Sequence, residues 1–134
     1  MSTTKRVFKI NKLIRDKLPA LLQAKNIGIC TRIMEEVEYI ERLKDKLLEE
    51  AHKVIGATNK LDLQEELADL LEVIHAICLA HELSYEEVEA TRHKKKTEKG
   101  GFETHVYSEF VEMEIDNPSI TYYLDNPDKY PELS

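Results

Sequence analysis

The chain has 134 residues, of which 34% are charged and 42% hydrophobic, and its formal net charge is −7. This length allows a domain with a hydrophobic core of its own, and four glycines, four prolines and no tryptophan argue against a many-turned β fold. The negative charge argues against binding to a nucleic-acid polymer, which needs a positive surface. It leaves a phosphate ligand possible, because a bound metal ion can reverse the local field.

The hydrophobic pattern predicts an all-α fold. Helices are expected over about 35–55, 62–81 and 84–99, because apolar residues recur there at steps of three or four or because capping signals bound the segment. The sequence also allows minor β-strands at about 29–34 and 102–111, which contain β-branched and aromatic residues.

Helix ends are predicted from single residues. Asp16 can cap a short first helix that has Pro19 in its first turn, and Gly28 can end it. Asp62 opens the third predicted helix with a capping-box pattern, and Ser84 does the same for the fourth.

We expect a helical domain over residues 1–115 and an extended tail over 116–134, rich in proline and tyrosine. Cys30 and Cys78 lack the spacing of metal ligands and are expected to be reduced, packed thiols. No signal peptide and no apolar run of membrane-spanning length is recognisable, so a cytoplasmic protein without a membrane partner is expected.

Three acidic residues are expected to meet where two of these helices pack. At about 100° per residue, the apolar face of the third helix centres near Leu67 and Ile74, and Glu66 lies roughly 80° from that centre with Asp69 beyond it. Glu50 lies about 80° from the centre of the second helix's face. Carboxylate oxygens suit Mg²⁺, although acids in solvated helix surfaces are an alternative explanation.

A run of cations ends the fourth predicted helix, immediately before Gly100 and Gly101. Lys95, Lys96 and Lys99 can offset the helix dipole there. Beside a flexible glycine corner they can equally bind phosphate oxygens, so they are candidate substrate-binding residues.

Four blocks, at 11–19, 47–50, 65–73 and 99–102, resemble in this order the MazG-like all-α nucleoside triphosphate pyrophosphohydrolases. More narrowly, the chain is similar to the small phosphoribosyl-ATP pyrophosphohydrolase-like members, and the resemblance covers roughly residues 7–111. It implies a four-helix core and a homodimer or higher homo-oligomer. It also implies Mg²⁺-dependent hydrolysis of a nucleotide substrate between its α and β phosphates, which releases monophosphate and pyrophosphate.

The family's metal pattern is Glu-x-x-Glu on one helix and Glu-x-x-Asp on the next. Glu66 and Asp69 match its second half and Glu50 matches its first residue, but Lys53 stands where the second glutamate is expected. The resemblance therefore implies Mg²⁺ ligands at Glu50, Glu66 and Asp69. Lys53 has two readings: it contacts a phosphate in place of a second metal ion, or it marks a relative that binds nucleotide or a protein partner without cleavage.

The resemblance also implies roles for other residues. Glu49 is the spare carboxylate that could take a proton from the attacking water, and the three lysines near Gly100 would stabilise the leaving pyrophosphate. Arg15 and Lys17, in the first block, would close over the ligand. A third reading is a helical interaction protein, whose melting temperature neither Mg²⁺ nor a nucleotide would raise.

Overall fold

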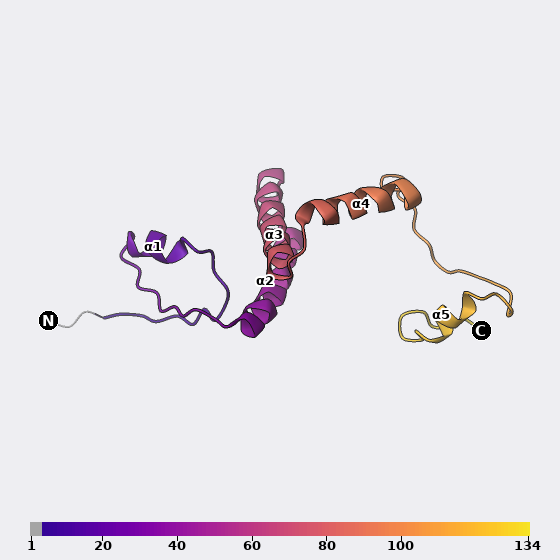
Figure 1. The fold of residues 1–134 in the computed structure, drawn as a ribbon, viewed down its shortest axis with the longest axis horizontal. Coiled ribbons are helices and arrows are strands. Elements are labelled where there is room, and N and C mark those ends of the chain that lie inside the picture. Colours follow the sequence, from indigo (N-terminus) through magenta and orange to yellow (C-terminus); the bar gives the residue numbers. More distant parts are fainter. Residues whose placement is uncertain (1–3) are drawn as a thin grey trace. The chain divides into compact units, whose positions relative to one another are not determined.

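The computed structural model describes residues 4–134, which form five helices and no strand (Figure 1). The helices are α1 (Leu18–Gln23), α2 (Glu36–Gly56), α3 (Lys60–Ala80), α4 (Tyr85–Lys99) and α5 (Ile120–Leu124). The all-α prediction is confirmed. Segments 29–34 and 102–111 form no strand, because neither finds another strand with which to pair.

The chain divides into two units, the first ending at Lys95 and the second beginning at Lys96, so the boundary falls inside α4. The first unit holds α1, α2, α3 and most of α4, and the second holds α5. In the part of the chain that the structure describes, no helix has both the length and the apolar character needed to cross a bilayer.

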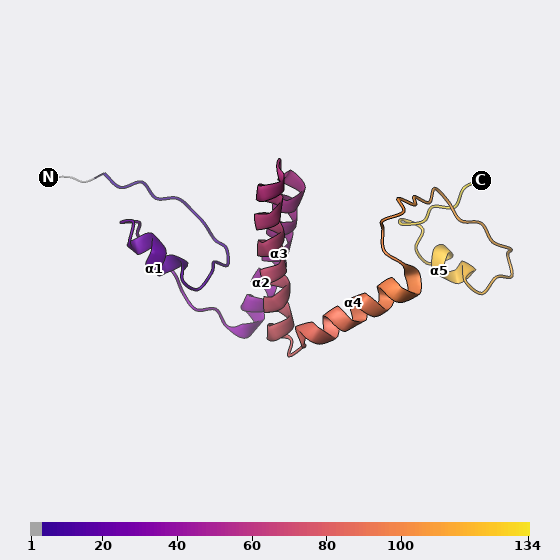
Figure 2. The same ribbon diagram turned by 90° about the horizontal axis from the view of Figure 1, so that it is seen from above.

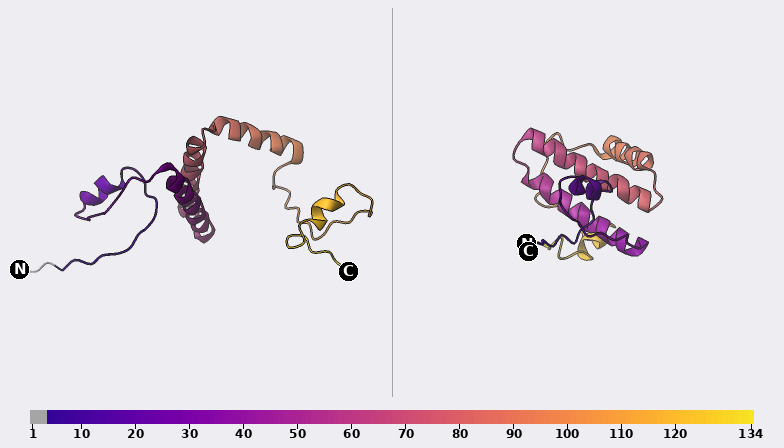
Figure 3. Two further views of the ribbon diagram at one scale, coloured as in Figure 1. Left: turned by 60° about the horizontal axis from the view of Figure 1, so that its bottom comes forward. Right: turned by 90° about the vertical axis from the view of Figure 1, so that its left-hand side faces the viewer.

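Helices α2 and α3 form a hairpin, and they are the pair of helices that pack against each other in the first unit (Figures 2 and 3). Leu43 from α2 and Val73 and Cys78 from α3 are the buried hydrophobic residues. Both helices begin and end within about two residues of the sequence prediction. Cys78 is a packed thiol as predicted, whereas Cys30 is exposed, which contradicts the prediction for that residue.

The start of α3 differs in detail from the prediction. Asn59 is the N-cap, and its side-chain oxygen accepts a hydrogen bond of 2.8 Å from the backbone N–H of Asp62. Asp62 therefore lies inside the first turn, where its charge is favourable to the helix dipole. At the start of α4 the hydroxyl of Ser84 accepts from the N–H of Glu87 at 3.4 Å, as its predicted capping role requires.

Helix α1 is shorter than its sequence signals indicated. Its N-cap is Lys17 without a side-chain hydrogen bond, so Asp16 is not the cap, while Pro19 does lie in the first turn. The predicted stop at Gly28 is also wrong. Asn26, with φ of 62°, takes the left-handed conformation after the helix, and asparagine is the residue that tolerates this best after glycine.

The end of α3 is a Schellman motif. The N–H of Leu83 donates to the carbonyl of Cys78 at 2.8 Å, and the N–H of Glu82 donates to the carbonyl of Leu79 at 3.2 Å. Glu82 has φ of 54°. A glutamate here bears the steric cost that the left-handed region imposes on a side chain with a Cβ atom.

The tail, which was expected to be extended, contains α5. In it Tyr122, Tyr123 and Tyr130 pack together, with ring centroids 5.0–5.6 Å apart. The ammonium group of Lys129 lies 5.2 Å from the ring centroid of Tyr130. Aromatic packing of this kind explains why the end of the chain forms local structure.

We expect Glu82→Gly to stabilise the protein by about 1 kcal/mol, since glycine adopts a positive φ without a Cβ clash. The midpoint of urea unfolding measures this change. Glu82→Ala is the matched control, because it removes the same carboxylate but keeps the Cβ atom, and it should give no gain. Equal effects of the two variants would contradict the backbone explanation.

Candidate metal centre

Three carboxylates from two helices converge in the first unit. Glu50 comes from α2, and Glu66 and Asp69 come from successive turns of α3. One oxygen from each lies within 4.8 Å of the others. The spacing of three residues on α3 sets Glu66 and Asp69 on the same side of that helix, and the packing of α2 against α3 brings Glu50 to them.

The carboxylate of Glu50 is buried, with 3% of the residue exposed. Its Oε1 atom lies 3.5 Å from Nζ of Lys46 and 3.6 Å from Nζ of Lys53, longer than the 2.7–2.9 Å typical of charge-assisted hydrogen bonds. Its Oε2 atom has no hydrogen-bond partner within residues 4–134, and neither does the buried Oε2 atom of Glu66. Two carboxylate oxygens are thus shielded from water and incompletely compensated, a state that a cation would relieve.

The donor set fits a hard divalent cation. Three carboxylates supply only oxygen atoms, which Mg²⁺, Mn²⁺ and Ca²⁺ prefer over softer metals. Glu50, Glu66 and Asp69 do not by themselves distinguish among these ions. The remaining coordination positions would be open to water or to oxygens of a ligand, as is usual for Mg²⁺.

Two lysines flank Glu50 on its own helix. Lys53, which stands where the family pattern has a second glutamate, follows Glu50 by three residues. Lys46 precedes Glu50 by four residues. Lys46 also forms an ion pair of 2.6 Å with Glu49. The sequence reasoning missed Lys46, although its helical spacing to both acids was a readable signal.

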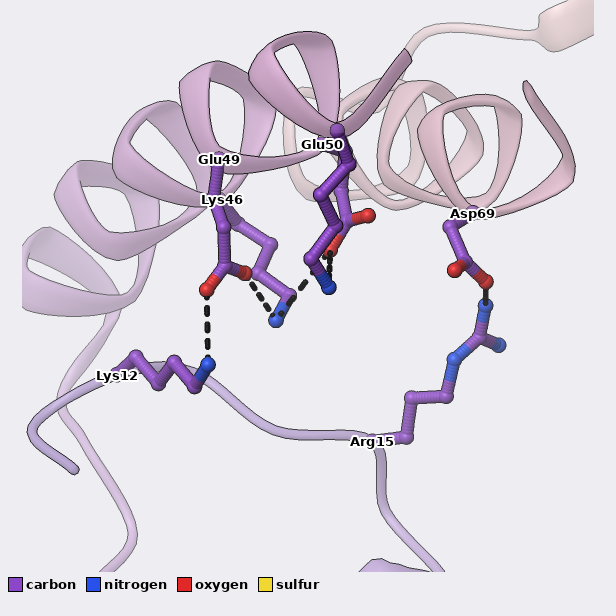
Figure 4. A network of polar contacts seen from close by, with 7 residues as sticks. Lys12, Arg15, Lys46, Glu49, Glu50 and Asp69 are labelled. Carbon is purple, nitrogen blue, oxygen red and sulfur yellow. Dashed lines mark hydrogen bonds and ion pairs between the residues drawn. The ribbon is translucent and has the colours of Figure 1, made fainter. Parts of the chain in front are cut away.

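The N-terminal segment lies against both helices (Figure 4). Nζ of Lys12 is 2.9 Å from Oε1 of Glu49, and Nη2 of Arg15 is 2.7 Å from Oδ1 of Asp69. Arg15 was a predicted ligand-binding residue and does lie at the acid cluster, whereas Lys12, from the same block, was missed. A cavity of ≈ 150 Å³ separates this segment from α2, and its lining is Asn11, Lys12, Leu13, Arg42, Asp45, Lys46 and Glu49.

Glu49 is held between two cations. Burial alone would raise the pKa of its carboxyl, but hydrogen bonds from Lys46 and Lys12 outweigh burial and lower the pKa to about 2. A carboxylate with such a pKa is a weak proton acceptor at neutral pH, which weighs against the general-base role predicted for Glu49. Its contacts suit it better to positioning Lys46 and Lys12.

Within the first unit, neither Lys17 nor Lys95 forms an ion pair with the acid cluster. Lys17 is exposed immediately before α1. Lys95 lines a different cavity, of ≈ 470 Å³, together with other residues of α4. Lys96 and Lys99 belong to the second unit, where Lys96 lies 3.4 Å from Glu103. Their contact with phosphate stays a prediction.

Comparison with protein-family models, with curated proteins and with solved structures finds no match for this chain. The resemblance to the MazG-like pyrophosphohydrolases is therefore a prediction carried by the four sequence blocks.

We expect Glu49→Gln to destabilise the protein by about 1–2 kcal/mol at pH 6, after allowance for the partial exposure of the site. The lowered pKa means that the ionised carboxylate stabilises the fold above pH 4.5, and that this contribution is lost as pH falls toward 2. The difference in melting temperature between wild type and variant should shrink from pH 6 to pH 3. Glu65→Gln, at an exposed position, is the control. A difference that does not change with pH would contradict the ion-pair explanation.

Proposed function

We propose that this protein is a nucleoside triphosphate pyrophosphohydrolase that depends on Mg²⁺ held by Glu50, Glu66 and Asp69. One observation carries the proposal: the buried Glu50 carboxylate, with an unpartnered oxygen, lies within 4.8 Å of two further acids. Exposed acidic clusters are common, but a buried, incompletely compensated carboxylate is costly to the fold. A bound cation would offset this cost.

The cations around the acids support a phosphate-bearing substrate. Lys46 and Lys53 place two ammonium groups beside Glu50, and Arg15 places a guanidinium beside Asp69. Lysine and arginine are the usual partners of phosphate oxygens. A site that alternates acids with cations suits a metal-bound polyphosphate, because the metal needs the acids and the remaining phosphate charge needs the cations.

The proposed reaction is attack of water on the α phosphorus, which breaks the bond between that phosphorus and the bridging oxygen and releases pyrophosphate. Bound Mg²⁺ would supply Lewis-acid stabilisation of the phosphate charge and a more acidic water. Lys46 and Lys53 would hold phosphate oxygens and stabilise the charge that develops on the leaving group. The resemblance of the four sequence blocks supplies the substrate class and the position of cleavage.

A second function is supported by Lys53 itself. Its ammonium group, 3.6 Å from Oε1 of Glu50, stands where the family pattern has a fourth carboxylate. A cation at this position lowers the affinity of the site for a second metal ion. The alternative is thus a relative that binds nucleotide or a protein partner as a sensing module and does not cleave the nucleotide.

We also propose a homodimer, formed through α3. Leu63, Leu67 and Leu71 form a stripe at intervals of four residues, and 37–46% of each residue is exposed. This exposure contrasts with the sequence pattern, which places Leu67 at the centre of an apolar face. Cys78, which is buried, lies roughly 20° around the helix from Leu67, so the exposed leucines belong to the same broad apolar face, which α2 covers only in part. A second copy of the hairpin would cover the rest of this face.

The first experiment is pyrophosphate release from a panel of ribo- and deoxyribonucleoside triphosphates with Mg²⁺. Glu66→Gln and Asp69→Asn should each lower the rate by about 100-fold or more, since even partners outside the metal's own ligands are worth 10–100-fold. Glu65→Gln, on the same helix but exposed, should retain the wild-type rate. Release that persists in the Glu66 and Asp69 variants would contradict the proposal.

The same assay separates the two functions. If Lys53 serves catalysis, Lys53→Glu lowers the rate. If the natural chain is an impaired relative, wild type releases no pyrophosphate, although nucleotides raise its melting temperature, and Lys53→Glu gains activity by supplying the fourth carboxylate.

For the dimer, we expect light scattering after gel filtration to give twice the chain mass of 15.6 kDa. Leu67→Glu should shift the protein toward monomer, because it puts a charge into the proposed interface. Leu79→Glu is the control, since Leu79 is exposed and lies roughly 120° around the helix from Leu67. A monomeric wild type, or equal effects of both variants, would contradict this interface.

A further inference from the structure

Residues 11–15, here called the strap, hold one member of the acid cluster through a cation of the chain itself (Figure 4). Arg15 pairs with Oδ1 of Asp69 at 2.7 Å. The other two carboxylates of the cluster, those of Glu50 and Glu66, each have a buried oxygen without a hydrogen-bond partner within residues 4–134. The strap thus occupies one of the three carboxylates that would bind a divalent cation and leaves oxygens of the other two open.

Two cations cannot share Asp69 without cost. A guanidinium 2.7 Å from a carboxylate oxygen lowers the negative potential that attracts a metal ion, and it repels a divalent charge brought to the same group. The pair is easily exchanged, because 61% of the Arg15 side chain and 38% of the Asp69 side chain are exposed. Exposed pairs of this kind hold each other only weakly.

We propose that Arg15 is an internal competitor of the divalent cation, which becomes a phosphate-binding residue once the cation displaces it from Asp69. The inference rests on the metal site of the proposed function and assigns the strap a second partner, the pyrophosphate group. The freed guanidinium presents a planar fork of N–H donors that matches phosphate oxygens. It stays beside the site because the strap is also tied to α2, through Lys12 and Glu49.

Lys12 offers a matched control within the same strap. Its partner Glu49 is not one of the three clustered acids, so loss of Lys12 removes a strap cation without releasing a metal ligand. The side chain of Lys12 is 49% exposed and that of Arg15 is 61% exposed. Neither substitution therefore removes buried packing, and both variants should fold.

The test uses the full chain and Mn²⁺ as the probe, with free Mn²⁺ measured by electron paramagnetic resonance at 0.15 M salt. Arg15→Gln should tighten Mn²⁺ binding by about three- to fivefold, the upper range for an exposed ion pair. Lys12→Gln should change it by less than about twofold, because screening limits its effect at a distance.

The second arm measures binding of inorganic pyrophosphate by calorimetry at saturating Mn²⁺. Here Arg15→Gln should weaken binding by at least about threefold, the opposite sign to its effect on the metal, since the variant lacks the guanidinium that binds phosphate. Arg15→Lys should fall between wild type and Arg15→Gln, because it keeps the charge and loses the planar fork. A residue with a merely structural role would not give effects of opposite sign.

The outcomes separate this inference from the function on which it rests. Mn²⁺ binding that Arg15→Gln leaves unchanged or weakens would overturn the competition while leaving the metal site intact. Pyrophosphate binding that Arg15→Gln leaves unchanged would overturn the phosphate role. Failure of wild type and of all variants to bind Mn²⁺ would overturn the metal site of the proposed function, and the exchange with it.

Discussion

The burial of one acidic side chain, that of Glu50, is the constraint on which the rest of the site depends. Its helix supplies two lysines at distances too long for strong hydrogen bonds, so much of the cost of removing a carboxylate from water is not offset by the chain. The hairpin bears this cost with few buried apolar residues, Leu43, Val73 and Cys78 being those described. A cation bound at this site, as in the proposed function, would offset that cost.

The electrostatic arrangement is a chain of neighbouring charges of alternating sign. The ion pairs run from Lys12 to Glu49, Lys46, Glu50 and Lys53. Arg15 of the strap pairs separately with Asp69 of α3. Of these acids, Glu49 has its pKa lowered to about 2, through hydrogen bonds from Lys46 and Lys12 that outweigh burial. In the proposed function, these cations would bind phosphate oxygens, so that binding of a metal and of a phosphate would be linked through the same side chains.

Much of the helical framework is predictable from the sequence, because periodic apolar residues over twenty positions leave little choice of period or face. The caps are less predictable: Asn59 and Asp62 both have capping side chains, and only packing decides between them. The three acids follow from angular position on two helices. The ion pairs of the strap do not, since they join residues 37 and 54 positions apart and one partner lies outside any helix.

In the hairpin, α2 and α3 pack in one register, and this register sets which acids of α3 lie opposite Glu50 of α2. Along α3, acids recur at 62, 65, 66, 69 and 72, so a slide of that helix by one turn, about 5.4 Å, would set a different pair of carboxylates opposite Glu50. Val73 and Cys78 would leave their buried positions in such a slide. The small apolar core therefore fixes the register of the two helices and determines which of several acids on α3 faces α2. A cation bound between the helices would stabilise that register further.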